Sequence, residues 1–232
     1  DQLKSLDDPE KPYLASMGIY VFKTDALKKL LDTSDGDDFG KNIIPTALEK
    51  QKVSAHIFKG FWEDIGTIRR FYEVNLALAQ KNPPFDLYSP QTPIYTRPRF
   101  LPGSEIYGAS LENVLIADGC TIASATIRNS VVGLRSRVGD SVTMTNTVMM
   151  GADYFESDAH RAANRAKNIP DMGVGSGSVI DGAIIDKNAR IGKGVIIRQL
   201  ENRANEENEN WVIKDNLVII PKNGIIKDGT VI

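Results

Sequence analysis

The second half of this 232-residue chain carries an aliphatic residue at nearly every sixth position. The repeat falls in three runs: Ile116, Ile122, Ile127, Val132, Val138, Met144 and Met150, then Val174, Ile180, Ile185, Ile191 and Ile197, and finally Ile213, Ile219, Ile225 and Val231. A helix of 3.6 residues per turn would spread such residues around its axis. A three-sided β-coil uses about six residues per face, points one aliphatic side chain inward and places glycine or asparagine at its corners. The repeat therefore predicts a hexapeptide β-helix over residues 106–232.

Two polar segments interrupt the repeat, at residues 151–173 and 198–211. Neither contains the regularly spaced aliphatic residues that a face of the β-helix needs. Long connections without such residues lie on the surface of a compact domain. We expect both segments to be loops that project from the β-helix.

The chain before residue 83 has a different pattern, in which strand-like and helix-like segments alternate. The run from Leu14 to Phe22 is almost continuously apolar, as in a strand buried on both faces, and residues 53–58 suggest a second, shorter strand. The predicted helices cover residues 25–31, with Thr24 as the N-cap, and residues 42–50 and 68–80. Alternating strands and helices are typical of a parallel α/β domain. Because two strands are too few for such a sheet, we expect more of this domain to precede Asp1.

A proline-rich segment separates the two patterns. Residues 83–105 contain six of the 11 prolines of the chain. Proline fixes φ and removes a hydrogen-bond donor, which favours an extended linker. We therefore predict a first domain at 1–82, a linker at 83–105 and a second domain at 106–232.

Composition excludes several classes of protein. The 28 basic and 30 acidic residues give a net charge of −2, so the chain has no overall field that would attract nucleic acid or an anionic membrane. No apolar run approaches the roughly 18 residues of a membrane span. The single cysteine, Cys120, cannot form an internal disulfide, which fits a reducing compartment. We expect a soluble intracellular protein without nucleic-acid or membrane partners.

Several segments, taken together, resemble ADP-glucose pyrophosphorylase (glucose-1-phosphate adenylyltransferase), and most closely its cyanobacterial and plant-like members. They are Tyr13-Leu-Ala-Ser-Met-Gly-Ile-Tyr-Val-Phe22, Asp38-Phe-Gly-Lys-Asn-Ile-Ile-Pro45, Phe61-Trp-Glu-Asp-Ile-Gly-Thr67, Ile94-Tyr-Thr-Arg-Pro-Arg-Phe-Leu-Pro102 and Ile184-Ile-Asp-Lys-Asn-Ala-Arg-Ile-Gly192. The resemblance covers nearly the whole chain in the right order. It implies the C-terminal part of a Rossmann-like α/β nucleotidyltransferase domain followed by a left-handed parallel β-helix.

The resemblance also implies a reaction. Members of this family convert ATP and glucose 1-phosphate into ADP-glucose and pyrophosphate for glycogen or starch synthesis, in the bacterial cytoplasm or the plastid stroma. Their glycine-rich ATP loop and one metal-binding aspartate have no counterpart here, so we expect both to lie upstream of Asp1. Glu10-Lys11-Pro12 matches the sugar-phosphate motif of the family but directly adjoins the predicted strand, which is the wrong place for it.

Three residues are implied as parts of the catalytic site. Asp64 is the counterpart of a family carboxylate that holds the catalytic Mg²⁺, although it could instead cap the helix that begins near Thr67. Ser16 matches a serine that contacts the glucose of the product, and a small residue in a tight sheet is its alternative role. Trp62 could wall the sugar pocket or serve as core packing.

Four basic residues match the effector sites of the family. Arg97 and Arg99 lie in the linker, whereas Lys187 and Lys222 lie in the β-helix. Such side chains bind phosphate or a phosphorylated sugar acid through charge-assisted hydrogen bonds. The resemblance further implies a homo- or hetero-tetramer.

Other functions remain open at this point. A non-catalytic regulatory or assembly subunit would have the same fold, and other sugar-nucleotide pyrophosphorylases share the architecture. A hexapeptide acyltransferase would need a catalytic histidine, for which only His160 is placed after the linker. A carbonic anhydrase with three histidine ligands is excluded, because the chain contains two histidines.

Overall fold

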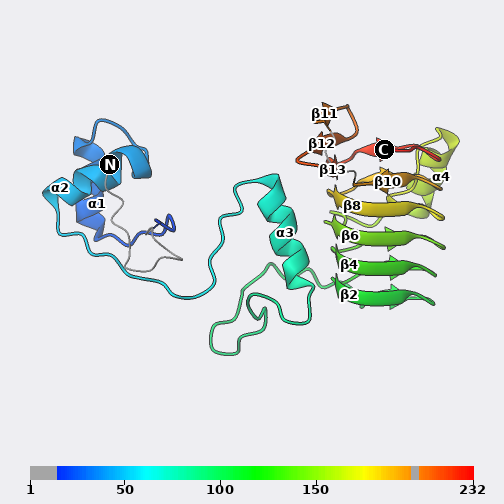
Figure 1. Cartoon of the computed structure of the whole chain (residues 1–232), viewed down its shortest axis with the longest axis horizontal. Coiled ribbons are helices and arrows are strands. Elements are labelled where there is room, and N and C mark those ends of the chain that lie inside the picture. Colours follow the sequence, from blue (N-terminus) through cyan, green and yellow to red (C-terminus); the bar gives the residue numbers. More distant parts are fainter. Residues whose placement is uncertain (1–14, 200–203) are drawn as a thin grey trace. The chain divides into compact units, whose positions relative to one another are not determined.

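The computed structural model describes residues 15–199 and 204–232 and divides the chain into two compact units, residues 1–64 and 65–232. The second unit contains a β-helix whose coils stack in parallel (Figure 1). Its strands are β1 (Glu105–Ile106), β2 (Ser110–Ile116), β3 (Thr121–Ile122), β4 (Thr126–Val132), β5 (Arg137–Val138), β6 (Thr143–Met149), β7 (Gly173–Val174), β8 (Val179–Ile185), β9 (Arg190–Ile191), β10 (Ile196–Arg198), β11 (Glu206–Glu207), β12 (Val212–Lys214), β13 (Leu217–Ile220) and β14 (Ile225–Ile226).

The coils have three faces, as the repeat predicted. Six two-residue strands form one sheet in the order β1-β3-β5-β7-β9-β14, and the longer strands β2, β4, β6 and β8 pair in a second sheet. Each longer strand turns a corner at its centre, where the φ values of Asn113, Asn129, Asn146 and Gly182 are 52°, 46°, 47° and 71°. These four residues stand in register from coil to coil. Asparagine and glycine tolerate this left-handed conformation, which explains their place at the corner.

The aliphatic repeat fills the interior. Eleven of its predicted members are at most 4% exposed: Ile122, Ile127, Val132, Val138, Met144, Val174, Ile180, Ile185, Ile191, Ile197 and Ile213. All eleven belong to one apolar cluster. At about 25 cal/mol per Å² of apolar surface, their burial is the main stabilising contribution to this unit.

The predicted inward residue is wrong by one position at four places. Met149, Ile220, Ile226 and Ile232 are buried, whereas Met150, Ile219, Ile225 and Val231 are more exposed, with Val231 at 71%. In each case two aliphatic residues are adjacent, and their side chains point to opposite faces of a strand. After Ile213 the chain also makes an antiparallel hairpin between β12 and β13, through Asp215 and Asn216. The hairpin shifts the repeat by one residue, so six positions after the buried Ile213 comes Ile219 rather than the buried Ile220.

The two predicted loops contain regular structure. Residues 151–173 include the helix α4 (Asp158–Ala166), none of whose residues is buried. Ser157 caps this helix, because its hydroxyl oxygen accepts from the N–H of His160. The second segment includes β11 and ends at the start of the hairpin, and its residues 200–203 lie outside the described part of the chain. The prediction of plain loops was therefore wrong for α4, because a helix without aliphatic residues leaves no apolar repeat.

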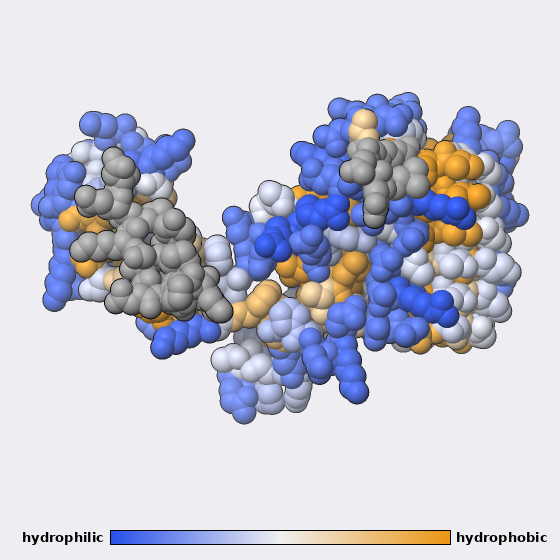
Figure 2. Space-filling model, in the orientation of Figure 1, coloured by the Kyte–Doolittle hydropathy of each residue, from blue (hydrophilic) through white to orange (hydrophobic). Residues whose placement is uncertain are grey.

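The helix α3 (Ile68–Leu78) confirms the helix predicted at 68–80 and packs on the outside of the β-helix. Its Tyr72 forms one apolar cluster with Val148, Ile184 and Leu217, and the Tyr72 hydroxyl donates to the carbonyl oxygen of Asn146 at 2.6 Å. Burial raises the pKa of Tyr72 to about 12. Figure 2 shows hydrophobic side chains between α3 and the strands. We predicted that the first domain ends at residue 82, but by packing α3 belongs with the β-helix unit.

The first unit contains the helices α1 (Thr24–Thr33) and α2 (Ile44–Lys50) and a π-helical turn, Phe39–Ile43. Leu30, Ile43 and Ala47 form its small apolar cluster. The predicted cap of α1 was wrong, because Thr24 is the first helical residue and Lys23 takes the N-cap position without a side-chain hydrogen bond. The helix predicted from residue 42 begins earlier, where Asp38 accepts from the N–H of Lys41 at 2.8 Å.

The two strands predicted in the first unit are wrong for its described residues, 15–64. The segments 15–23 and 51–64 are not assigned to strands in that part of the chain. Ile19 and Val21 are 72% and 98% exposed. An apolar run becomes a strand only when its N–H and C=O groups find a partner, and sequence alone does not supply one. Leu14 lies outside the described residues.

No helix in the described residues, 15–199 and 204–232, is long and apolar enough to cross a lipid bilayer.

Candidate effector site and catalytic segment

Two of the predicted effector residues meet at one corner of the β-helix. Lys187 follows β8 and Lys222 follows β13, and each precedes an asparagine with positive φ, Asn188 at 62° and Asn223 at 64°. The pairing of β14 with β9 places Lys222 one coil from Lys187. Neighbouring coils are separated by about 4.8 Å, so both ammonium groups can reach one anion.

Asp153 supplies that anion within the chain. Its Oδ2 lies 2.7 Å from Nζ of Lys222, and its Oδ1 lies 3.3 Å from Nζ of Lys187. Asn188 donates from Nδ2 to Oδ2 of Asp153 at 3.1 Å and accepts from the Asp153 backbone N–H at 2.8 Å. The hydrogen bond from Lys222, followed by that from Asn188, lowers the pKa of Asp153 to about 2. The same contact raises the pKa of Lys222.

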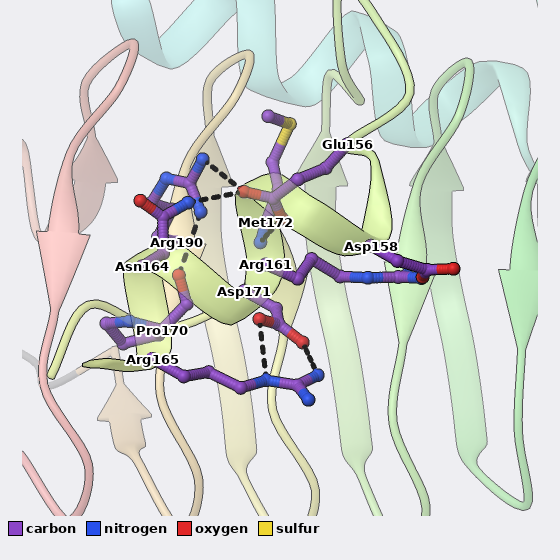
Figure 3. Close-up of polar contacts among 9 residues, drawn as sticks. All are labelled: Glu156, Asp158, Arg161, Asn164, Arg165, Pro170, Asp171, Met172 and Arg190. Atoms are coloured by element: carbon purple, nitrogen blue, oxygen red, sulfur yellow. Dashed lines mark hydrogen bonds and ion pairs between the residues drawn. The ribbon is translucent and has the colours of Figure 1, made fainter. Parts of the chain in front are cut away.

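The segment that carries Asp153 is fastened by a buried ion pair, shown in Figure 3. Arg190 lies with Nη2 at 2.6 Å from Oε1 of Glu156, and their side chains are 14% and 1% exposed. Glu156 also accepts from Nδ2 of Asn164 at 2.7 Å and from the N–H of Met172 at 3.0 Å. Arg190 donates in addition to the carbonyl oxygen of Pro170 at 2.9 Å. Both ends of the excursion that contains α4 are thus tied to β9.

The residues just before Glu156 have contacts of their own. The guanidinium carbon of Arg135 lies 5.6 Å from the ring centroid of Phe155, a cation–π distance. Arg135 also donates to the carbonyl oxygen of Ala152 at 3.1 Å. Asp153 therefore lies between two fixed neighbours, which holds its backbone beside the lysines.

The two linker arginines are exposed. Arg99 donates from Nη1 to the carbonyl oxygen of Arg97 at 3.3 Å, which is a local contact within the linker. The predicted anion clamp between these arginines and the lysines stays a prediction.

The predicted catalytic residues lie in the first unit. The Ser16 hydroxyl is 3.1 Å from the hydroxyl of Tyr20 and accepts from the N–H of Gly18 at 3.2 Å. Trp62 is 42% exposed, which disfavours core packing as its role in this unit. Asp64 is exposed, and the N-cap of α3 is Thr67, whose hydroxyl accepts from the N–H of Arg70 at 3.2 Å. Ser16, Trp62 and Asp64 are all exposed, and their catalytic roles stay predictions.

Over 15–199 and 204–232 no three or more His, Cys, Asp and Glu side chains gather as a ready-made metal site. Mg²⁺ is commonly bound through one or two carboxylates together with substrate phosphates and water. An exposed carboxylate such as Asp64 fits that mode of binding.

Sequence reasoning missed Asp153, Glu156 and Arg190 as site residues. An acidic residue in a polar insertion carries no periodic signal. One signal was present: the dipeptide Lys-Asn occurs at Lys187 and at Lys222, at the same position of two coils. This repetition predicts two cations on one corner.

Two family models match the chain. Residues 7–81 match the nucleotidyl transferase family, and residues 99–231 match the GLGC left-handed parallel beta-helix domain. The matches confirm the predicted order of an α/β nucleotidyltransferase part followed by a β-helix, and the second match identifies the β-helix as left-handed. They also agree with the resemblance carried by the sequence segments. The chain therefore belongs to the GLGC β-helix family, as an ADP-glucose pyrophosphorylase-like protein with a nucleotidyltransferase domain.

Proposed function

We propose that this chain is part of a glucose-1-phosphate adenylyltransferase, which forms ADP-glucose and pyrophosphate from ATP and glucose 1-phosphate for glycogen or starch synthesis. The observation that carries the proposal is the presence of both family matches in one chain, the nucleotidyl transferase first and the GLGC β-helix second. The nucleotidyl transferase match supports nucleotide and sugar-phosphate substrates, and the GLGC match favours the adenylyl enzyme over other sugar-nucleotide pyrophosphorylases.

The reaction asks mainly for positioning and charge. A phosphate oxygen of glucose 1-phosphate attacks the α-phosphorus of ATP, the bond to the β-phosphate oxygen breaks, and pyrophosphate leaves. Bound Mg²⁺ would offset the negative charge on the phosphoryl oxygens. Asp64 would hold this ion through its carboxylate. Ser16 would hydrogen-bond a glucose hydroxyl, and the exposed ring of Trp62 would form an apolar wall beside the sugar.

We further propose that anionic metabolites regulate the enzyme at Lys187 and Lys222. Their convergence on one carboxylate supports this role, because two ammonium groups that already share an anion are placed to share a phosphate. A phosphorylated sugar acid or inorganic phosphate fits this chemistry, and Arg97 and Arg99 would supply further donors. The proposal includes a homo- or hetero-tetramer to which the β-helix contributes, located in a bacterial cytoplasm or a plastid.

The catalytic role is tested in the full-length protein by replacing Asp64 with asparagine. We expect turnover of ATP and glucose 1-phosphate to fall by orders of magnitude and the Mg²⁺ requirement to rise, while circular dichroism stays unchanged. Asp35→Asn, which removes another exposed carboxylate of the first unit, is the matched control.

Three other results would contradict parts of the proposal. Native turnover of Asp64→Asn at low Mg²⁺ would remove Asp64 from the site. Synthesis of a different sugar nucleotide by the native protein would identify another pyrophosphorylase. A folded full-length protein that makes no sugar nucleotide would indicate a regulatory or assembly subunit.

A further inference from the structure

The corner that holds Lys187 and Lys222 already contains its own counter-charge. Two ammonium groups and the Asp153 carboxylate leave the cluster with one net positive charge. The carboxylate accepts from both lysines and from Asn188, so its oxygens occupy the positions that an external anion would need. Any anion that binds the two lysines must therefore displace the Asp153 carboxylate or lie close to its negative charge.

The contacts within the cluster are exchangeable. The side chains of Lys187, Lys222 and Asp153 are 40%, 52% and 36% exposed, and ion pairs between such accessible groups are weak. A phosphate dianion offers more charge and more acceptor oxygens than one carboxylate. It would consequently satisfy both lysines better than Asp153 does.

The backbone of Asp153 remains at the corner even when its side chain moves. Its N–H donates to Asn188, and three residues later Glu156 is locked to Arg190 and to Met172. A displaced carboxylate thus stays tethered within a few ångströms of the lysines. It can return whenever the external anion leaves.

We propose that Asp153 is a built-in competitor for the anion site formed by Lys187 and Lys222, and that it sets the anion concentration at which this site fills. The inference rests on the anion site of the proposed function, but it does not depend on catalysis. Removal of the Asp153 charge leaves the two lysines without their internal partner and removes a like charge beside the bound anion. Anion affinity should consequently rise.

The experiment is a phosphate titration of the 232-residue chain, followed by isothermal calorimetry at pH 7.5 and low salt. Asp153→Asn keeps the shape of the side chain and an oxygen for the amide of Asn188. We expect its Kd for inorganic phosphate to be about tenfold lower than that of the native chain, the effect of one unit charge about 5 Å from a dianion in an accessible site. This difference should shrink as sodium chloride is added.

Two variants serve as controls. Asp171→Asn removes a carboxylate that pairs with Arg165 in the same excursion, so it matches the charge change and should leave the Kd unchanged. Lys222→Ala should weaken phosphate binding by about tenfold or more. If Asp153→Asn does not fold, Asp153→Ser removes the same charge.

The outcomes separate the two claims. If Lys222→Ala weakens phosphate binding but the neutral Asp153 variants bind no tighter than the native chain, the anion site stands and the competitor role is refuted. If phosphate binds with the same Kd with and without Lys222, the anion lies elsewhere and both claims fail. Neither result depends on whether the full-length protein makes ADP-glucose.

Discussion

Replacing Glu156 with glutamine should destabilise the β-helix unit by about 3 kcal/mol. Loss of one partner of a buried ion pair costs about 3–5 kcal/mol, because the other charge stays buried without compensation. Here Arg190 would remain at 14% exposure and keep its bond to the carbonyl oxygen of Pro170, but it would lose its charged partner. Glutamine retains a carbonyl oxygen that can accept from the N–H of Met172, which places the cost near the lower end of this range.

The change is measured by thermal unfolding followed by circular dichroism. For a unit of this size, about 3 kcal/mol corresponds to a fall in Tm of about 6–12 °C. Glu112→Gln is the matched control, since its carboxylate pairs with Arg128 at 3.3 Å with both side chains more than half exposed. We expect the control to change stability by less than about 0.5 kcal/mol.

Acid pH gives an independent reading of the same contact. Burial raises the pKa of Glu156, but the Met172 N–H and Arg190 outweigh burial and lower the pKa below its usual 4.5. The unfolded chain then binds the proton more readily than the folded chain, so the stabilisation is complete above pH 4.5 and is lost as the pH falls below that value. The stability gap between the native chain and Glu156→Gln should narrow over the same range. An equal loss in Glu156→Gln and Glu112→Gln at neutral pH would refute the reasoning.

Two further predictions concern packing. Ile226→Ala should cost about 2–5 kcal/mol in urea unfolding, whereas Val231→Ala should cost less than about 0.5 kcal/mol, because Ile226 is 2% exposed and Val231 is 71% exposed; equal costs would contradict the inward register at the end of the β-helix. Tyr72→Phe should cost about 1–2 kcal/mol in the same assay, because the hydroxyl bond to Asn146 is lost while the ring stays packed. An unchanged urea midpoint for Tyr72→Phe would show that this hydrogen bond adds nothing to stability.

The β-helix could be predicted from sequence because its core is periodic. Ile180 and Ile191 are buried at the places that the repeat gives them, since each coil meets the same environment as its neighbours. The predicted inward residue was wrong where two aliphatic residues are adjacent, because the six-residue period does not distinguish between them. Next to Ile220 and Ile226 stands a second aliphatic residue, and only the hairpin through Asp215 determines which of the two points inward.

The candidate site was only partly predictable for a related reason. Lys187 and Lys222 repeat at one position of the coil, so a residue pattern places them together. Asp153 meets them from an insertion whose path depends on the buried contact between Glu156 and Arg190. That contact joins residues 34 positions apart in the chain, and no local pattern records it. In the first unit we predicted a strand from the apolar run around Ile19. A strand forms only when a neighbouring segment pairs with it, and the run itself does not encode that segment.

The position of α3 bears on how this protein can be divided. By sequence α3 lies inside the nucleotidyl transferase match at 7–81, but by packing it covers the outer apolar face made by Val148, Ile184 and Leu217. Cutting the protein at the proline-rich segment would remove α3 and leave an exposed, aggregation-prone hydrophobic patch on an otherwise intact β-helix. The boundary at which the chain can be separated, or exchanged with that of a relative, therefore lies before Ile65 and inside the nucleotidyl transferase match.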